Sequence, residues 1–165
     1  DLHRASATGL RDAPGWASPV ARLTTHIKDE EPQMSDTVSH ESVVAEGLPA
    51  PIGPYSPGVT LDRLVLVSGQ GATDPATGAL AGHDVTTQTE QVFRNIQAIL
   101  EAAGSDLSHV LRCGVFLVDL RDFAEMNAVY ARVFGDHRPA RTTVQVAALP
   151  DKGLRVEIDA IAYRP

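Results

Sequence analysis

The period of the hydrophobic pattern changes along the chain, and this change restricts the possible folds more than any other feature. Residues 84–103 show helical spacing, with one apolar stripe formed by Val92, Ile96, Ile99, Leu100 and Ala103. Asp84 can cap the start of this helix and Gly104 its end. Because a helix with a single apolar stripe buries that stripe against another element, this segment is predicted to be a helix that covers a sheet.

Four other segments have the pattern of strands: residues 64–67, 110–118, 142–146 and 154–162. The first two are apolar on both alternating sets apart from Arg112, which is typical of strands with two covered faces. In the last segment, an apolar set alternates with a more polar one; the apolar set is Leu154, Val156, Ile158 and Ala160. Glu157 is therefore expected on the face opposite the helix-covered core.

A second helix is predicted over residues 120–134, with Asp119 as its N-terminal cap and Gly135 at its C-terminal end. Its stripe consists of Phe123, Met126, Asn127, Tyr130 and Phe134. Asn127 is the exception, because an amide among core positions must be satisfied by hydrogen bonds or serve a site. The pattern as a whole predicts an α+β domain, with a mixed β-sheet and two helices on one face.

The other face of the predicted sheet has no covering element within the chain. The runs 64–67 and 115–118 are apolar on both faces, and an exposed apolar area of this kind is unusual in a monomer. We therefore expect this face to be buried against copies of the same chain in a dimer or closed ring. Glu157, with Gln145 as a further candidate, would then gather with Arg141 in clefts between subunits.

Length, charge and cysteine content exclude several classes of protein. A chain of 165 residues with 43% hydrophobic residues predicts one domain with a sizeable core. The 14 Lys and Arg are outnumbered by 21 Asp and Glu, and a net charge of −7 argues against nucleic-acid binding. Cys113 is the single cysteine and is predicted to be packed in the core, so no internal disulfide forms. No apolar run is long enough to span a membrane, and we expect a cytoplasmic protein without membrane contacts.

Residues 1–44 differ from the rest of the chain. They are rich in Ala, Ser, Thr, Pro and charged residues and show no sustained period, which predicts a disordered N-terminal extension before a domain at residues 45–165. Basic residues among small polar ones leave a transit peptide open as an alternative. Met34 is a candidate native start, since the compact domain begins soon after it.

Arg141 stands where a rigid turn leads into the predicted strand 142–146. Pro139 fixes its own φ angle and favours extended geometry at Arg138, so Arg141 is expected to start from a stiff backbone. Its planar guanidinium can bind both oxygens of a carboxylate through two parallel hydrogen bonds. From this segment alone, a surface ion pair is the alternative role for Arg141.

Two further polar residues lie in or beside rigid segments. Tyr55 belongs to the loop 50–58, where three prolines and two glycines enforce an irregular, stiff backbone. Ser68 follows the buried run 64–67, where its hydroxyl can bond to the backbone or face a ligand. For Glu157, a solvated sheet face is the alternative to a role in a site.

Together these residues resemble the Rid/YjgF family, often called reactive intermediate deaminases. The resemblance covers residues 50–163 and combines six motifs in order. They are Ile52-Gly53-Pro54-Tyr55-Ser56, Val67-Ser68-Gly69-Gln70, Asp74-Pro75-Ala76-Thr77-Gly78, Asn127-Ala128-Val129-Tyr130, Pro139-Ala140-Arg141-Thr142 and Val156-Glu157-Ile158-Asp159-Ala160-Ile161-Ala162. The resemblance implies a chorismate-mutase-like (YjgF-like) α+β fold that assembles as a trimer with three clefts between subunits.

The resemblance also implies an activity: hydrolysis of reactive enamines and imines, such as 2-aminoacrylate, 2-aminocrotonate and their imino tautomers, to 2-keto acids and ammonia. No cofactor is implied, and the histidines show no metal-ligand spacing. Arg141 matches the family's substrate-carboxylate arginine. Glu157 is expected to position the attacking water or pass its proton.

The remaining positions of the implied cleft are expected to bind substrate. Tyr55, Ser68 and Asn127 match family positions, and Thr143 stands where some members have Cys. The chain also departs from the family at Pro57-Gly58, where many members have Gln-Ala. These departures bear on the choice of substrate more than on the chemistry.

Two other functions are compatible with a chain of this kind or have been attached to the family. A noncatalytic trimer could bind small carboxylates, or protect other proteins as a chaperone does, through the same clefts. An endoribonuclease activity is sometimes attached to this family, but the acidic charge and the absence of a basic and aromatic stripe argue against it here.

Overall fold

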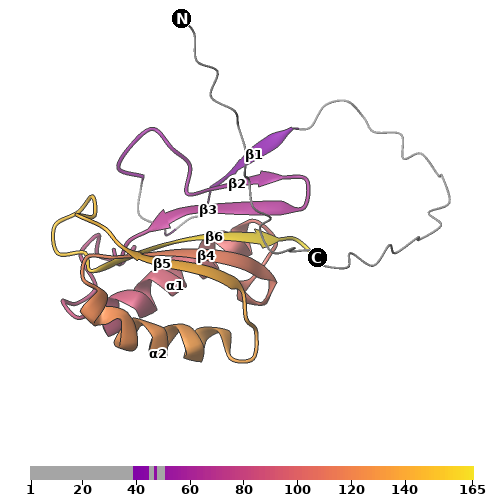
Figure 1. Ribbon diagram of the computed structural model, residues 1–165. Helices are drawn as coiled ribbons and strands as arrows, with labels where there is room; N and C mark the ends of the chain where they lie inside the picture. The colour runs from indigo at the N-terminus through magenta and orange to yellow at the C-terminus, as the bar shows by residue number, and fades with distance from the viewer. Residues whose placement is uncertain (1–38, 45–46, 48–50) are drawn as a thin grey trace, which may run out of the picture. The chain divides into compact units, whose positions relative to one another are not determined.

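The computed structural model describes residues 39–44, 47 and 51–165, which form one six-stranded sheet and two α-helices (Figure 1). The strands are β1 (His40–Val43), β2 (Gly58–Leu61), β3 (Leu64–Gln70), β4 (Val110–Leu117), β5 (Ala140–Gln145) and β6 (Val156–Tyr163). The helices are α1 (Val85–Ala102) and α2 (Phe123–Phe134), with short 3-10 helices η1 (Leu107–His109) and η2 (Leu120–Asp122). The predicted α+β class, with a mixed sheet and two helices, is confirmed.

The sheet has the strand order β1-β2-β3-β6-β4-β5, so the last strand of the chain lies in its middle. β4 and β5 are parallel and are connected through α2, while all other neighbouring pairs are antiparallel. Residues that pair across neighbouring strands have side chains on the same face of the sheet. The register therefore decides which residues lie on the helix-covered face and which on the open face.

Both helices have the predicted C-terminal ends, and α1 also has the predicted N-terminal cap. The Asp84 side chain accepts a hydrogen bond from the Thr87 N–H at 2.8 Å and caps α1. Gly104 follows the last turn of α1 with a φ of 77°, in the left-handed region that favours glycine. α2 begins at Phe123, later than predicted, because residues 120–122 form η2, which is capped by Asp119. Gly135, with a φ of 56°, ends α2 as expected.

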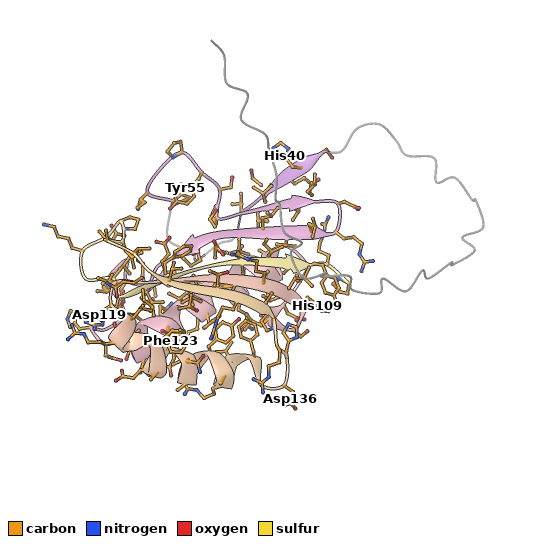
Figure 2. The ribbon with its side chains drawn as sticks, viewed as in Figure 1. His40, Tyr55, His109, Asp119, Phe123 and Asp136 are labelled. Atoms are coloured by element: carbon orange, nitrogen blue, oxygen red, sulfur yellow. The ribbon has the colours of Figure 1, made fainter. Side chains whose placement is uncertain are left out.

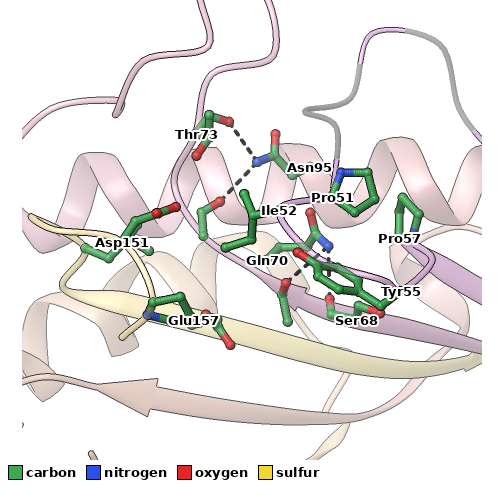
Figure 3. A pocket seen from close by; sticks show the side chains of 14 residues that line it. Pro51, Ile52, Tyr55, Pro57, Ser68, Gln70, Thr73, Asn95, Asp151 and Glu157 are labelled. Atoms are coloured by element: carbon green, nitrogen blue, oxygen red, sulfur yellow. Dashed lines mark hydrogen bonds between the residues drawn. The ribbon is translucent and has the colours of Figure 1, made fainter. Parts of the chain in front are cut away.

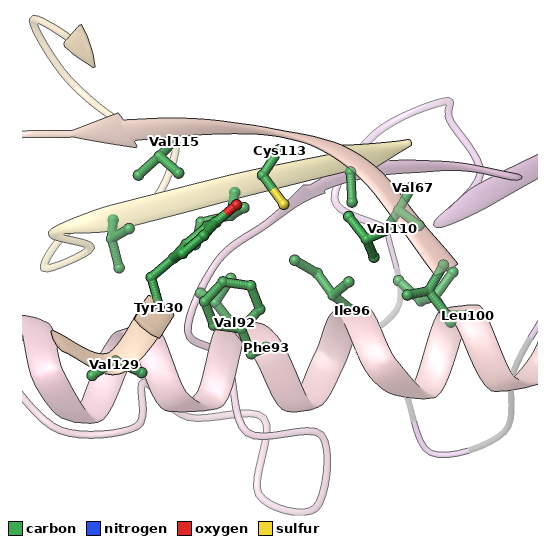
Figure 4. Close-up of a cluster of buried hydrophobic side chains, with 14 of the residues drawn as sticks. Val67, Val92, Phe93, Ile96, Leu100, Val110, Cys113, Val115, Val129 and Tyr130 are labelled. Carbon is green, nitrogen blue, oxygen red and sulfur yellow. The ribbon is translucent and has the colours of Figure 1, made fainter. Parts of the chain in front are cut away.

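The core lies between the two helices and the helix-covered face of the sheet. The predicted stripe of α1 is buried there, with Val92, Ile96 and Leu100 at most 1% exposed (Figure 4). Phe93 of α1 makes an edge contact with Tyr130 of α2 at 5.6 Å between ring centroids. Truncating a residue buried in this way typically costs about 2–5 kcal/mol of the free energy of unfolding. None of the helices among the described residues combines the length and apolar character needed to cross a membrane.

Cys113 lies in this core, as predicted, and is fully buried. Burial raises the pKa of its thiol to about 11. At neutral pH the thiol is therefore protonated, and it packs as a small apolar group.

The open face of the sheet carries large apolar side chains without a covering element in the described part of the chain. Leu64, Leu66 and Val144 are 43%, 42% and 40% exposed. An ion pair between Arg112 and Asp159, at 3.5 Å, lies among them. This face is the one that the sequence predicts to be buried against other copies of the chain.

The structure differs from the sequence prediction at the N-terminal edge of the sheet. The sequence predicts no regular structure in residues 1–44, but His40–Val43 form the edge strand β1, antiparallel to β2. The strand β2, Gly58–Leu61, is also absent from the four predicted strands. Only Val43 is buried in β1, so the strand lacks the alternation that a sequence pattern would reveal. Its stability comes from pairing with β2. Residues 1–38 of the predicted extension, with Met34, lie outside the described residues.

Candidate functional site

A pocket of about 390 Å³ opens beside β3 and β6 (Figure 3). It is lined by Pro51, Ile52, Tyr55, Pro57, Ser68, Gly69, Gln70, Gly71, Thr73, Asn95, Pro150, Asp151, Leu154 and Glu157. We call it the β3–β6 pocket. Three of the predicted site residues, Tyr55, Ser68 and Glu157, meet in this pocket, and its two ionisable acids are Asp151 and Glu157.

The loop that carries Tyr55 is held by backbone hydrogen bonds and by Ser68. The Ser68 hydroxyl donates to the Ser56 carbonyl at 2.7 Å, and the Ser68 N–H donates to the Pro57 carbonyl at 2.9 Å. Ser68 therefore makes the backbone bond that the sequence left open as an alternative, and it lines the pocket as well. Tyr55 is 47% exposed, and its ring faces the pocket from the loop (Figure 3).

Glu157 extends from β6 across Gly69 of β3. A β-carbon added to Gly69 would lie 2.4 Å from Glu157 Oε1, closer than any real contact, so only glycine leaves room for this carboxyl group. Glu157 is half-buried. Burial raises the pKa of Glu157 above its ordinary value, and the carboxylates of Asp159 and Asp151 raise it further.

Two amide side chains of α1, which sequence reasoning missed, hold the backbone around this pocket. Asn95 Nδ2 donates to the carbonyls of Gly71 at 3.1 Å and Thr73 at 3.0 Å. Gln88 Nε2 donates to the Gly153 carbonyl at 2.9 Å, and Gln88 Oε1 accepts from the Arg155 N–H at 2.7 Å. Both side chains are at most 2% exposed.

A sequence signal for these residues existed. Gln88 and Asn95 fall on the same face of α1 as Val92 and Ile99, among residues that are mostly apolar. A buried amide must find hydrogen-bond partners, so polar residues on such a stripe indicate a fixed loop or a site nearby.

A second, smaller pocket of about 240 Å³ lies between α2 and the start of β5. It is lined by Asn127, Tyr130, Ala131, Phe134, His137, Arg138, Pro139 and Arg141. We call it the α2–β5 pocket. Two more of the predicted site residues, Asn127 and Arg141, lie here, and no acidic residue lines it.

The Arg141 guanidinium is held by aromatic rings of α2. Its central carbon lies 4.5 Å from the centroid of the Tyr130 ring and 5.7 Å from that of Phe123. Such cation–π contacts are worth about 0.5–1 kcal/mol each at exposed sites. Among the described residues, Arg141 takes part in no ion pair, so the surface ion pair considered from the sequence is not formed.

Thr143, the remaining predicted site residue, lies on β5 opposite Val115, which is fully buried. Its hydroxyl is buried and finds no hydrogen-bond partner among the described residues. The Tyr130 hydroxyl is also buried without a hydrogen-bond partner among the described residues. Burial raises the pKa of Tyr130. Thr143 does not line either pocket of the isolated chain.

Within one chain, Arg141 and Glu157 do not share a pocket or a face of the sheet. Arg141 pairs with Cys113 on the helix-covered face, whereas Glu157 pairs with Phe116 on the open face. In Figure 2, strands of the sheet lie between Tyr55, on the loop before β2, and Phe123, at the start of α2. The predicted site is therefore divided into an acidic half, in the β3–β6 pocket, and a basic half, in the α2–β5 pocket.

Gln145, the further candidate for the open face, is placed differently. It pairs with Leu117 on the helix-covered side, and its Oε1 accepts from the Leu120 N–H at 3.0 Å. It therefore holds the start of η2, and its assignment to the same face as Glu157 is wrong. The alternation of β5 could not reveal this, because the face depends on the register with β4.

Comparison with known proteins finds similarity over the part of the chain that forms the sheet and the helices. A family model described as Endoribonuclease L-PSP matches residues 46–164. A RutC family protein of Pyrococcus horikoshii is 47% identical over 124 residues, which cover 75% of this chain and 98% of the relative. A 2-iminobutanoate/2-iminopropanoate deaminase of Salmonella typhimurium is 46% identical over 127 residues, covering 75% and 98%.

A solved structure has the same fold. The crystal structure of E. coli TdcF with bound serine shares 40% sequence identity with a TM-score of 0.71, and the match covers 76% of this chain and 99% of TdcF. The six motifs, the sheet with its two helices and these similarities all lie in the same part of the chain. The chain therefore belongs to the Rid/YjgF family.

Proposed function

We propose that this protein hydrolyses short 2-imino acids and their enamine tautomers to 2-keto acids and ammonia, in sites shared between the subunits of a homotrimer. The observation that carries this proposal is the Arg141 guanidinium, which is held against Tyr130 in a pocket without any acidic residue. A guanidinium placed in this way can bind a substrate carboxylate through two hydrogen bonds. The relatives named 2-iminobutanoate/2-iminopropanoate deaminase support the reaction class.

The division of the site supports an assembly of several chains. The acidic half and the basic half lie in separate pockets of one chain, and the open sheet face exposes Leu64, Leu66 and Val144. Burying that face against a neighbouring subunit would remove apolar area from water. The same contact would bring the α2–β5 pocket of one chain next to the β3–β6 pocket of another. Three such sites would form in a closed trimer.

The proposed reaction needs orientation more than a strong nucleophile. A protonated imine is already electrophilic at its carbon. Arg141 fixes the carboxylate, Tyr55 and Ser68 bound the cleft, and Glu157 accepts a proton from the attacking water. The water oxygen then bonds to the imine carbon, and the proton passes on to the nitrogen. The carbon–nitrogen bond breaks as the carbon–oxygen double bond forms, and the remaining hydroxyl proton is released. The products are a 2-keto acid and ammonia, and no electron is gained or lost.

A direct assay tests the proposal. An amino-acid oxidase or a dehydratase generates 2-iminopropanoate or 2-iminobutanoate, and the disappearance of the imine is followed with and without the protein. Faster hydrolysis in the presence of the protein supports the deaminase. Binding of small carboxylates without any acceleration would instead favour the noncatalytic alternative.

Mixing two inactive variants tests whether the site is shared. Arg141→Ala chains and Glu157→Gln chains are denatured together, refolded, and compared with each variant refolded alone. A random mixture in equal amounts should regain about a quarter of the wild-type sites, because a shared site takes Arg141 from one chain and Glu157 from another. No recovery in hybrids that sediment as trimers would place both residues in one chain's site and contradict the arrangement.

The raised pKa of Glu157 predicts the pH dependence. A general base must be ionised, so the rate should fall on acidification at a pH above the ordinary glutamate pKa of 4.5. In Asp151→Asn, one nearby negative charge is removed, the pKa of Glu157 falls, and the acidic limb of kcat should move to lower pH. A limb that stays in place in this variant would mean that another group limits the rate.

A further inference from the structure

Two arginines of the α2–β5 pocket differ from the other arginines of the described chain. Arg94, Arg112, Arg121, Arg132 and Arg155 each pair with a carboxylate, while Arg63 and Arg164 donate to backbone carbonyls. Within the described residues, the guanidinium groups of Arg138 and Arg141 make neither an ion pair nor a hydrogen bond. Both line the same pocket.

The surroundings of these two arginines favour a ligand with more than one negative charge. Acidic residues outnumber basic ones in this chain by 21 to 14, yet none lines the pocket. His137 is also in its wall, with Nε2 at 2.6 Å from the Val110 carbonyl oxygen. Pro139 stands between the arginines and stiffens the backbone that carries both. Two guanidinium groups without counter-charges offer two carboxylate sites rather than one.

We propose that Arg138 binds a second acidic group, so that the preferred substrates are 2-imino acids with a carboxylate in the side chain, the imines of acidic amino acids. This inference rests on the proposed function, in which Arg141 binds the carboxylate next to the imine carbon. Arg138 is then the residue that determines specificity, and the reaction itself is unchanged.

Electrostatics in the other half of the site supports the same orientation. The β3–β6 pocket carries Asp151 and Glu157, which would repel a side-chain carboxylate and attract a protonated imine. A dicarboxylic imino acid therefore has one favourable orientation, with both acidic groups in the α2–β5 pocket. At about 240 Å³, that pocket is below the usual size of a complete ligand site and suits one end of a small molecule.

Paired substrates test the proposal. Amino-acid oxidases acting on glutamate and on 2-aminobutanoate supply 2-iminoglutarate and 2-iminobutanoate, and the ratio of their kcat/KM values is measured. In Arg138→Gln, this ratio should fall about tenfold, the usual effect of losing one charge-assisted hydrogen bond, with the 2-iminobutanoate value nearly unchanged. Arg132→Gln is the matched control, because it removes the same charge from an arginine paired with Glu90 outside the pocket.

Other outcomes are equally informative. An unchanged ratio in Arg138→Gln, or an equal loss for both substrates, overturns the proposal. Weaker trimer association in Arg138→Gln, with an unchanged ratio, would instead assign Arg138 to an ion pair with a neighbouring subunit and also overturns it.

A binding measurement separates this inference from the proposed function. Calorimetry with glutarate and butanoate, which carry no imine, should show tighter binding of glutarate to the wild type, and Arg138→Gln should abolish that preference. If no imine is hydrolysed but this preference is found, the deaminase proposal fails and the dicarboxylate site stands. If imines are hydrolysed without any preference for glutarate, only the dicarboxylate site fails.

Discussion

Replacing Arg141 by Ala should lower kcat/KM for 2-iminobutanoate by about a hundredfold or more, because it removes two charge-assisted hydrogen bonds to the substrate carboxylate. Arg141→Lys should recover little of this loss. A lysine ammonium keeps the charge but lacks the planar fork that matches both carboxylate oxygens, and it stacks less well on Tyr130.

Stability measurements distinguish a functional role of Arg141 from a structural one. The free energy of unfolding should change by only about 1 kcal/mol in Arg141→Ala, since the side chain is in no ion pair of the described chain and loses only its contacts with aromatic rings. Arg132→Ala, which breaks an exposed ion pair with Glu90, is the control and should keep full activity. Equal rates for wild type and Arg141→Ala would falsify the deaminase assignment.

Gly69→Ala should remove most of the activity without any change to a group that reacts. The new methyl group would overlap Glu157 Oε1, which lies 2.4 Å from its position, so the carboxyl group must leave its present position. A loss of a general base typically costs about 10²–10⁴ in rate, and we expect kcat in Gly69→Ala and in Glu157→Gln to fall within that range. KM should change much less than kcat.

A double-mutant cycle shows whether Gly69 acts through Glu157. If it does, Gly69→Ala should have almost no effect on kcat when Glu157 is already Gln. Gly114→Ala provides a comparison, because its methyl group would lie 2.6 Å from Asp159 Oδ1, on the same face but outside the β3–β6 pocket. For samples that sediment like the wild type, Gly114→Ala should keep activity that Gly69→Ala loses. Additive losses in the cycle would assign Gly69 a role independent of Glu157.

Glu157→Gln itself should not destabilise the fold. The raised pKa of Glu157 means that the folded chain holds the proton more tightly than the unfolded chain. Stability from this group is therefore present at low pH and is lost as the pH rises through the raised pKa. At neutral pH, a neutral amide avoids that penalty. A variant that is inactive but at least as stable as the wild type is the pattern expected of a residue kept for function.

Much of the fold could be predicted from local patterns. The helical stripe of α1, with Ile96 and Leu100, and the alternation of β6 around Glu157 depend only on the periods 3.6 and 2, which burial on one face imposes. The end of α2 at Gly135 and the cap of α1 at Asp84 follow from backbone preferences of single residues. The identity of the candidate residues followed from the motifs around them.

Edge strands and loop anchors were not predictable in this way. β1 carries one buried residue, Val43, and is stabilised by its antiparallel backbone pairing with β2. Gln88 and Asn95 stand out in the sequence as amides on the apolar face of α1, but the loops that they hold are identified only in the structure, where segments distant in the chain pass beside α1. In both cases the stabilising partner is far away in sequence, and no local period records it.

The sequence by itself determined the order of the two helices and of four of the six strands, the apolar open face and the arginine at the start of β5, because periodicity, turns and proline act over a few neighbouring residues. Only the tertiary structure decided that Arg141 and Glu157 face opposite sides of the sheet. That outcome depends on the register of β5 with β4 and of β4 with β6, and a shift of one residue would reverse it. It also decided that Arg138 shares a pocket with Arg141, because the space between α2 and β5 forms only when helix and strand pack together.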